Sequence, residues 1–131
     1  MSPIVETSTP PNTPTPIGPY SHIAKVGSFI TIGGTAGVNP AAGQIAEPDI
    51  AAQTKQILDS FKVMLESVNS DLEHVVHINI FLKHMGDFEE MNRAYIEKMG
   101  EYRPARTVIG VNELPKPGFL LTMNLTAVTK E

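Results

Sequence analysis

The sequence predicts an α+β fold in which two helices pack on one face of a mixed β-sheet. Two segments carry apolar residues at spacings of three and four, as amphipathic helices do, and five short runs have the alternation or β-branched content of strands. Their order along the chain is strand, strand, helix, strand, helix, strand, strand. Two helices can cover only one side of such a sheet, so its other face is left open.

The composition is that of one globular domain covering residues 1–131. Apolar residues make up 41% of the chain, charged residues 18%, and the net charge is −4. This charge argues against a nucleic-acid partner, which needs a basic face, and gives no attraction to an acidic membrane surface. The absence of cysteine excludes disulfides and thiolate chemistry. Since we find no secretory signal and no membrane-spanning run, a soluble cytoplasmic protein is expected.

The first strands are predicted to form a hairpin. Residues 1–19 are rich in Pro, Thr and Ser and are expected to be extended or loop-like, with an extended segment over 1–16, and Gly18-Pro19 is a turn signal that directs Tyr20. Two runs, "HIAKV" and "FITIGG", are separated by Gly27-Ser28, which suits a type II′ turn. The Gly33-Gly34 pair predicts a bend or a close backbone approach.

Two helices follow, the first after a loop over residues 35–48. Asp49 is its expected N-cap, and Asn69-Ser70-Asp71 its expected end. Its apolar stripe consists of Ile50, Thr54, Ile57, Leu58, Phe61, Leu65 and Val68. The second helix is predicted to begin near Asp87 and to end at Gly100. Its inward residues are expected to be Phe88, Met91, Tyr95, Ile96 and Met99.

Three further strands are predicted, over residues 75–83, 106–111 and 119–128. In the first, Val76, Ile78, Ile80 and Leu82 share the face expected to be core. In the last, Phe119, Leu121, Met123, Leu125 and Ala127 alternate with a more polar set. The open face then carries Asn79, Phe81, Leu120, Thr122, Asn124 and Thr126. Because this face is too apolar to remain hydrated in a monomer, we expect a homo-oligomer that buries it.

Arg106 is the residue that most needs an explanation. It directly precedes an apolar strand, and a guanidinium that stays charged is costly to leave unpaired there. One interpretation is an ion pair with a local carboxylate such as Glu101 or Asp87. The other is a clamp for a carboxylate ligand, which the planar fork of donors suits, with backbone N–H groups of the strand completing the contact.

Other candidate residues also have two interpretations. Tyr20 is either a packing residue or part of a site, and Asn92 either caps a loop carbonyl or serves as a fixed donor and acceptor. His74, His77 and His84 are not predicted to bind a metal, since residues three apart on a strand point to opposite faces and no carboxylate supports them. "GGTAG" lacks the lysine of a phosphate loop, and no nucleophile elbow is present.

Four motifs together resemble the RidA/YjgF family of reactive intermediate deaminases. They are "IGPYS", the hairpin leading to "GG" and "VNP", "DFEEMNRAY" and "RPARTVIGV…LP", and the resemblance runs from about Pro14 to Val128. It implies a chorismate-mutase-like α+β fold and a homotrimer with ligand sites between subunits. Active members of the family hydrolyse enamines and imines such as 2-aminoacrylate to the 2-keto acid and ammonia, without a metal or organic cofactor.

The resemblance also assigns roles to residues. It implies that Arg106 holds the substrate carboxylate, that the backbone N–H at Val108 assists at the adjacent oxygen, and that Tyr20 lines the cleft from the neighbouring subunit. Asn92 would support this arrangement. The remaining predicted substrate-binding residues are Gly33, Gly34 and Thr122.

Three positions depart from the family pattern. Gly33 stands where many active members have a serine, Val108 where they commonly have a cysteine, and Thr122 where they have a glutamate proposed to position the water. No acidic residue lies between Glu113 and Glu131.

Two functions therefore follow: an imine deaminase that uses Thr122, Thr35 or Tyr20 with ordered water, or a non-catalytic trimer that binds small carboxylates as a sensor, scavenger or partner-binding module. A ribonuclease role is disfavoured by the net charge.

Overall fold

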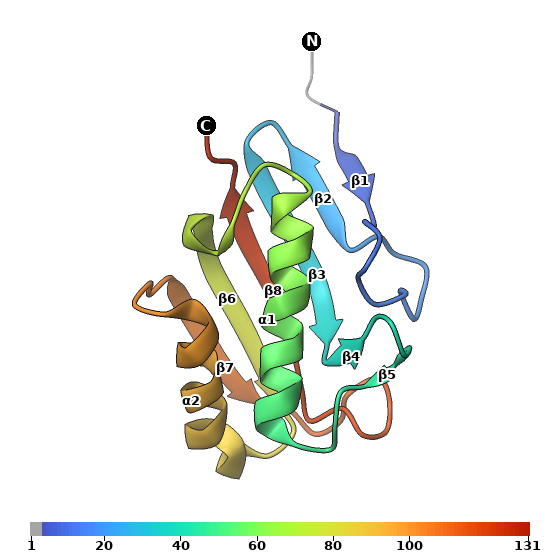
Figure 1. Cartoon of the computed structure of the whole chain (residues 1–131), viewed down its shortest axis with the longest axis vertical. Helices are drawn as coiled ribbons and strands as arrows, with labels where there is room; N and C mark the ends of the chain where they lie inside the picture. Colours follow the sequence, from blue (N-terminus) through green and yellow to red (C-terminus); the bar gives the residue numbers. More distant parts are fainter. Residues whose placement is uncertain (1–3) are drawn as a thin grey trace.

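The computed structural model describes residues 4–131 and shows a six-stranded sheet in the order β1-β2-β3-β8-β6-β7 (Figure 1). All neighbouring strands are antiparallel except β6 and β7, which are parallel. The strands are β1 (Glu6–Ser8), β2 (Ile23–Val26), β3 (Phe29–Ala36), β6 (Val75–Leu82), β7 (Ala105–Gly110) and β8 (Leu121–Val128). The predicted α+β fold with a mixed sheet is confirmed.

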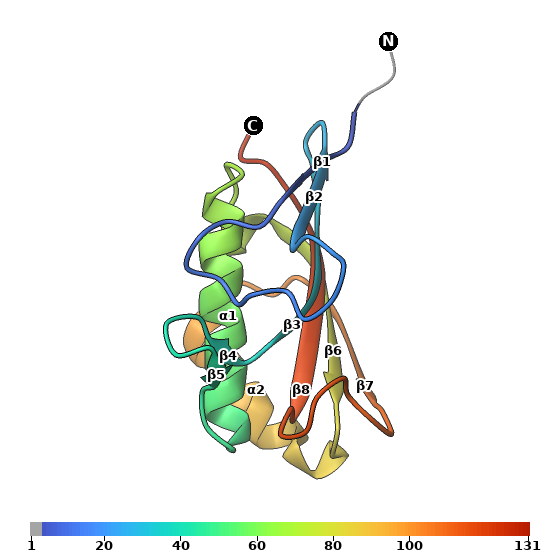
Figure 2. The same ribbon diagram turned by 90° about the vertical axis from the view of Figure 1, so that its right-hand side faces the viewer.

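Both helices, α1 (Ile50–Glu66) and α2 (Phe88–Met99), lie on the same face of the sheet, and the opposite face is bare (Figure 2). The predicted cap of α1 is present, because the Asp49 carboxylate accepts a hydrogen bond of 3.0 Å from the Ala52 N–H. Asp87 occupies the N-cap position of α2 but makes no side-chain capping bond. As expected, α2 ends at Gly100, whose φ of 64° stops the helix.

The core lies between the helices and the sheet. It contains the expected stripe of α1 from Ile50 to Leu65 and the alternate residues of β8 from Leu121 to Ala127. Because α1 ends at Glu66, before the expected end at residues 69–71, Val68 packs against the core from outside the helix. The predicted hairpin is also present. Val26 pairs with Phe29, and Gly27 has a φ of 60° while Ser28 does not have a positive φ, as a type II′ turn requires.

Several short elements were not predicted. β1 pairs with β2 along a stretch expected only to be extended, and the predicted loop over 35–48 contains the small hairpin of β4 (Val38–Asn39) and β5 (Gln44–Ile45). Single 3₁₀ turns, η1 (Leu72–His74) and η2 (Met85–Asp87), precede β6 and α2. Such elements are too short for a periodic signal, so only their tertiary pairing defines them.

Three side chains lie on a different face from the one predicted. Val76 is 51% exposed and Val75 is buried, because the β6–β8 register shifts between Val75 and His77. Ile96 is exposed on α2 rather than inward. Leu120 lies just before β8 and packs against the core, so it does not belong to the open face.

One buried glutamine attaches α1 to the loops at the end of the sheet. The Gln53 side chain donates to the carbonyls of Glu47 and Gly118 at 2.9 and 3.0 Å and accepts 2.9 Å from the Leu120 N–H. Gly37 packs so closely here that an added Cβ would lie 2.7 Å from the Gln53 Cα. These contacts hold the segment before β8, which lines the site described below.

The bare face of the sheet is of mixed polarity. Asn79 and Asn124 join across β6 and β8 by a side-chain hydrogen bond of 2.9 Å, and Phe29 at one end is 46% exposed. Most side chains between them are half-buried within one chain. Within residues 4–131, no helix has the length and apolar character needed to cross a membrane.

Candidate functional site

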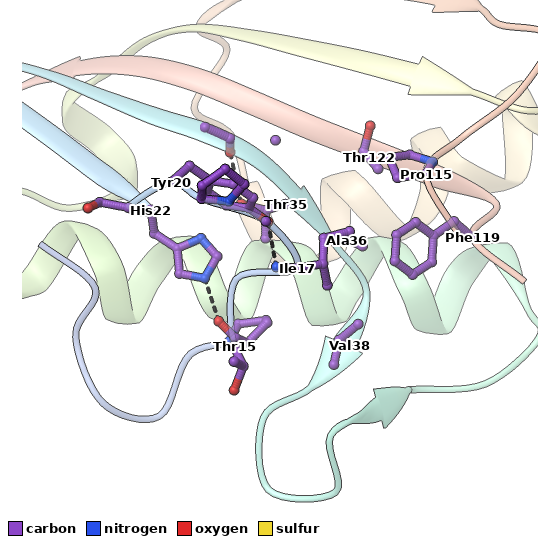
Figure 3. A pocket seen from close by; sticks show the side chains of 16 residues that line it. Thr15, Ile17, Tyr20, His22, Thr35, Ala36, Val38, Pro115, Phe119 and Thr122 are labelled. Carbon is purple, nitrogen blue, oxygen red and sulfur yellow. Dashed lines mark hydrogen bonds between the residues drawn. The ribbon is translucent and has the colours of Figure 1, made fainter. Parts of the chain in front are cut away.

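The predicted site residues fall into two separate cavities. The first, which we call the tyrosine cavity, has a volume of about 640 Å³ and lies where the segment before β2 meets the ends of β3 and β8 (Figure 3). Four of the predicted site residues, Tyr20, Gly33, Gly34 and Thr122, line it. None of its sixteen lining residues is acidic.

Tyr20 forms an exposed wall of this cavity. Its hydroxyl oxygen accepts a hydrogen bond of 3.2 Å from the Ile17 N–H, which leaves the hydroxyl proton free to donate. The ring packs edge to face against His22, with centroids 5.9 Å apart. His22 is itself buried, and its Nε2 contacts the Pro14 carbonyl (Figure 3), while its Nδ1 has no partner among the described residues.

Gly33 contributes space to the tyrosine cavity rather than hydrogen-bonding groups. Its N–H donates to the His22 carbonyl at 3.0 Å, and its carbonyl accepts from the Thr35 hydroxyl, also at 3.0 Å. It lies in the irregular part of β3, where the register with β8 shifts between Ile32 and Thr35. Thr122, on β8 opposite Ala36, closes the far side of the cavity.

The second cavity contains Arg106 and is named the arginine cavity. It has a volume of about 310 Å³ and lies between α2 and the chain entering β7. It is lined by Asn92, Tyr95, Ile96, Arg103, Pro104 and Arg106. Two predicted site residues, Asn92 and Arg106, therefore lie together, while Tyr95 and Arg103 were not foreseen as neighbours.

Arg106 is held by aromatic rings rather than by an acid. Its guanidinium carbon lies 4.8 Å from the ring centre of Tyr95 and 6.0 Å from that of Phe88. No ion pair between residues 4–131 includes an arginine, so the interpretation as a pair with Glu101 or Asp87 is wrong for the single chain. The stacked guanidinium keeps its charge and its donors for another group.

Two residues that line the arginine cavity carry buried polar atoms without partners. The Tyr95 hydroxyl and the Asn92 Oδ1 are both buried and have no hydrogen bond in the described part of the chain. Burial raises the pKa of Tyr95, although the Arg106 and Arg103 charges oppose this, so the hydroxyl stays protonated at neutral pH. It can therefore donate to an anion.

Val108, the remaining residue predicted beside Arg106, does not itself line the arginine cavity. Its side chain packs against the core, opposite Ile80 in the parallel register of β6 and β7. β7 is the last strand of the sheet, and alternate N–H groups of such an edge strand have no ladder partner.

One copy of the chain does not bring the two cavities together. They share no lining residue. Arg106 lies on β7 at one edge of the sheet, and Tyr20 precedes β2, four strand spacings away, or ~19 Å at the usual interstrand distance. Each cavity thus presents only part of the residue set that the sequence grouped together.

Several residues that line these cavities were not predicted from the sequence as part of a site. His22 and Phe119 line the tyrosine cavity, and Tyr95 and Arg103 line the arginine cavity. A histidine two residues after Tyr20 and an arginine three residues before Arg106 are visible signals, but neither has a pattern that specifies a contact. Among the described residues, no group of three His, Asp or Glu side chains is arranged to hold a metal ion.

Comparison with known sequences assigns the chain to a family. The family model described as Endoribonuclease L-PSP matches residues 10–129. A RutC family protein of Pyrococcus horikoshii is 43% identical over 105 residues, covering 80% of this chain and 83% of that protein. A protein of Dermatophagoides farinae named 2-iminobutanoate/2-iminopropanoate deaminase is 34% identical over 116 residues, covering 88% of this chain and 90% of that one.

Solved structures agree with the sequence comparison. The crystal structure of YjgF from E. coli matches with a TM-score of 0.88 and 32% identity, covering 94% of this chain and 98% of that one. RidA from an Antarctic Psychrobacter matches with a TM-score of 0.89 and 28% identity, at the same coverage of both chains. The chain therefore belongs to the RidA/YjgF/RutC family.

Proposed function

We propose that this protein hydrolyses 2-imino acids, and the enamines that tautomerise to them, to 2-keto acids and ammonia. The observation that carries the proposal is the Arg106 guanidinium, stacked on Tyr95 without any carboxylate partner in residues 4–131. A fixed guanidinium suits a substrate carboxylate, to which it can make two parallel hydrogen bonds. A relative with the printed name of 2-iminobutanoate/2-iminopropanoate deaminase gives the reaction class.

The proposed site is formed between copies of the chain in a homotrimer. One copy supplies Arg106, Asn92 and the backbone of Val108, and the next supplies Tyr20, Gly34 and Thr122. The separation of the two cavities within one chain supports this arrangement, because neither cavity alone holds both a carboxylate clamp and the hydroxyl groups.

The chemistry needs orientation, water and proton transfer. Water adds to the electrophilic imine carbon, its proton passes to the nitrogen, and the carbinolamine then releases ammonia as the carbonyl forms. Tyr20 is the proposed proton donor, since its oxygen accepts from the Ile17 N–H and its own hydroxyl proton is free. Thr122 and Thr35 provide hydroxyl groups that can hold the water, and no activated nucleophile is required.

A second candidate function is favoured by the absence of any acidic residue in the tyrosine cavity. Without a general base, the same trimer would bind small carboxylates such as 2-keto acids as a sensor or interaction module. We retain this alternative because it uses Arg106 in the same way and differs only in turnover.

The test is to form 2-iminobutanoate in situ with a threonine dehydratase and to follow its decay to 2-oxobutanoate. We expect the wild-type protein to accelerate decay and Arg106→Ala to lower kcat/KM roughly 100-fold, since a charge-assisted clamp is lost. Arg93→Ala is the matched control, because Arg93 is an exposed arginine of α2 that does not line either cavity.

Two results would contradict these assignments. No acceleration by the wild type, together with saturable binding of 2-oxobutanoate, would favour the non-catalytic binder. Equal rates for Arg106→Ala and the wild type would exclude Arg106 as the clamp.

A further inference from the structure

The arginine cavity contains two guanidinium groups and no acid. Arg103 and Arg106 both line it, with Asn92, Tyr95, Ile96 and Pro104 as the other lining residues. One guanidinium is enough for the single carboxylate of a simple 2-imino acid. The second charge in the same cavity therefore needs its own explanation.

Arg103 is fixed in place without being neutralised. Its Nη1 donates to the Gly100 carbonyl at 2.5 Å and to the Tyr102 carbonyl at 3.1 Å. Carbonyls orient a guanidinium but do not cancel its charge. Its remaining N–H groups have no acceptor in the described part of the chain, so they are available to a ligand.

The ion pairs between the two helices do not compensate these charges. On α2, Glu97 pairs with Lys55 of α1 at 2.5 Å, and Lys98 pairs with Asp59 of α1 at 2.9 Å. The ion pairs between the helices therefore use lysines, and the arginines are left out of every pair found in residues 4–131.

The hydroxyl group of Tyr95, which lines the cavity, is a second and independent indication of an anionic ligand. Tyr95 is only 4% exposed, yet its hydroxyl has no partner among the described residues. A buried hydroxyl without a hydrogen bond is costly, and the cost is relieved when a ligand accepts a hydrogen bond from it. Tyr95 lines the same cavity as the two arginines, and this combination favours a ligand with several oxygen atoms.

We propose that Arg103 and Arg106 together select dicarboxylates, so that the preferred ligands are 2-oxo and 2-imino acids with a second carboxylate in the side chain. Arg106 holds the carboxylate next to the reacting carbon, and Arg103 holds the distal one. The identity of the imine as substrate rests on the proposed function, whereas the dicarboxylate preference is a binding property that can be measured without turnover.

The binding test compares two five-carbon probes, 2-oxoglutarate and 2-oxopentanoate, which differ in the second carboxylate. We expect calorimetry on the full chain at low ionic strength to show roughly tenfold tighter binding of 2-oxoglutarate. Arg103→Gln should reduce the preference to about twofold or less, and Arg103→Lys should retain part of it. Arg93→Gln removes the same charge from α2 outside the cavity and should leave the preference unchanged.

An assay of imine hydrolysis separates this inference from the proposed function. A flavin amino-acid oxidase forms the corresponding imines from glutamate and norvaline, and their decay is followed with each variant. Hydrolysis of the norvaline imine without any dicarboxylate preference would overturn the role of Arg103 and leave the deaminase intact. A preference that depends on Arg103, with neither imine hydrolysed, would refute the deaminase and support the dicarboxylate site.

Two binding results would also overturn the inference. One is equal affinity for the two probes or no binding of either at millimolar concentration. The other is a preference for 2-oxoglutarate that persists unchanged in Arg103→Gln.

Discussion

Tyr95 carries a buried hydroxyl that makes no hydrogen bond within the described part of the chain. Its ring supports the Arg106 guanidinium and packs in the core, but the hydroxyl group has no partner in residues 4–131. The nearby Tyr102 shows the opposite case, because its hydroxyl donates to the Val75 carbonyl at 2.6 Å. These two tyrosines allow structural and ligand-binding roles to be separated.

We predict that Tyr95→Phe leaves the melting temperature unchanged or slightly higher, because it removes an unsatisfied buried polar group. The same change should weaken binding of 2-oxobutanoate about three- to tenfold, since one donor to the ligand is lost. Thermal denaturation and calorimetry measure the two effects.

Tyr102→Phe is the matched control. It should lower the free energy of unfolding by about 1 kcal/mol, because the carbonyl of Val75 loses its hydrogen bond. Destabilisation of Tyr95→Phe by as much as Tyr102→Phe would show that the Tyr95 hydroxyl has a structural partner.

Strands β3 and β8 supply Gly33 and Thr122, two lining residues that affect the chemistry of the tyrosine cavity. The irregular pairing between Ile32 and Thr35 moves Gly33 out of the regular ladder, and Thr122 lies on β8 opposite Ala36. A Cβ added at Gly33 would have no atom within 4 Å, and the residue does not have a positive φ. The backbone at this position thus accepts the serine that the family resemblance leads us to expect.

We predict that the double variant Gly33→Ser, Thr122→Glu hydrolyses 2-iminobutanoate about tenfold or more faster than the wild type, because a carboxylate in the cavity can act as a general base toward water. Thr122→Gln in the same Gly33→Ser background is the control for size without charge. Equal rates for the glutamate and glutamine variants would show that an acid at this position does not take part.

The whole molecule leaves one face of its sheet uncovered, and the two halves of the proposed site lie far apart in one chain. The bare face favours association through it (Figure 2), and the separation of the two halves favours a site shared between chains. Thr126 is a useful position for testing this association because it lies on the open face of β8, between Thr31 of β3 and His77 of β6. Its neighbours in sequence, Leu125 and Ala127, are buried on the other side.

We predict that the wild-type protein has a solution mass of three times the chain mass of 14.2 kDa. Thr126→Arg should shift it to the mass of one folded chain and abolish imine hydrolysis, because burying an unpaired charge in the interface is costly. Light scattering and circular dichroism provide the measurements.

Val63→Arg places the same charge on the exposed side of α1, where Val63 is 37% exposed, and should leave the trimer intact. A trimer that survives Thr126→Arg would exclude the open face as the interface.

Much of the fold follows from local patterns. The stripe of α1 and the alternation of β8 were correctly assigned to the core, because each pattern records which side of one element faces away from water. The two-residue turn at Gly27-Ser28 was likewise predictable, since its conformation depends on the residues in it. The family motifs around Tyr20 and Arg106 were also visible in the sequence, because each motif consists of residues that are close together along the chain.

What the sequence could not specify depends on residues distant along the chain. The shift in the β6–β8 register exposes Val76, and only the partner strand defines such a shift. Arg106 was expected to pair with a local acid or to bind a ligand, and the packing of α2 places aromatic rings beside it and no paired acid in residues 4–131. The sequence thus determined the helices and strands and the chemistry of the site residues. Tertiary packing decided that Arg103 lines the same cavity as Arg106 and that Tyr20 lines a different one, because a cavity forms only when separate elements pack together.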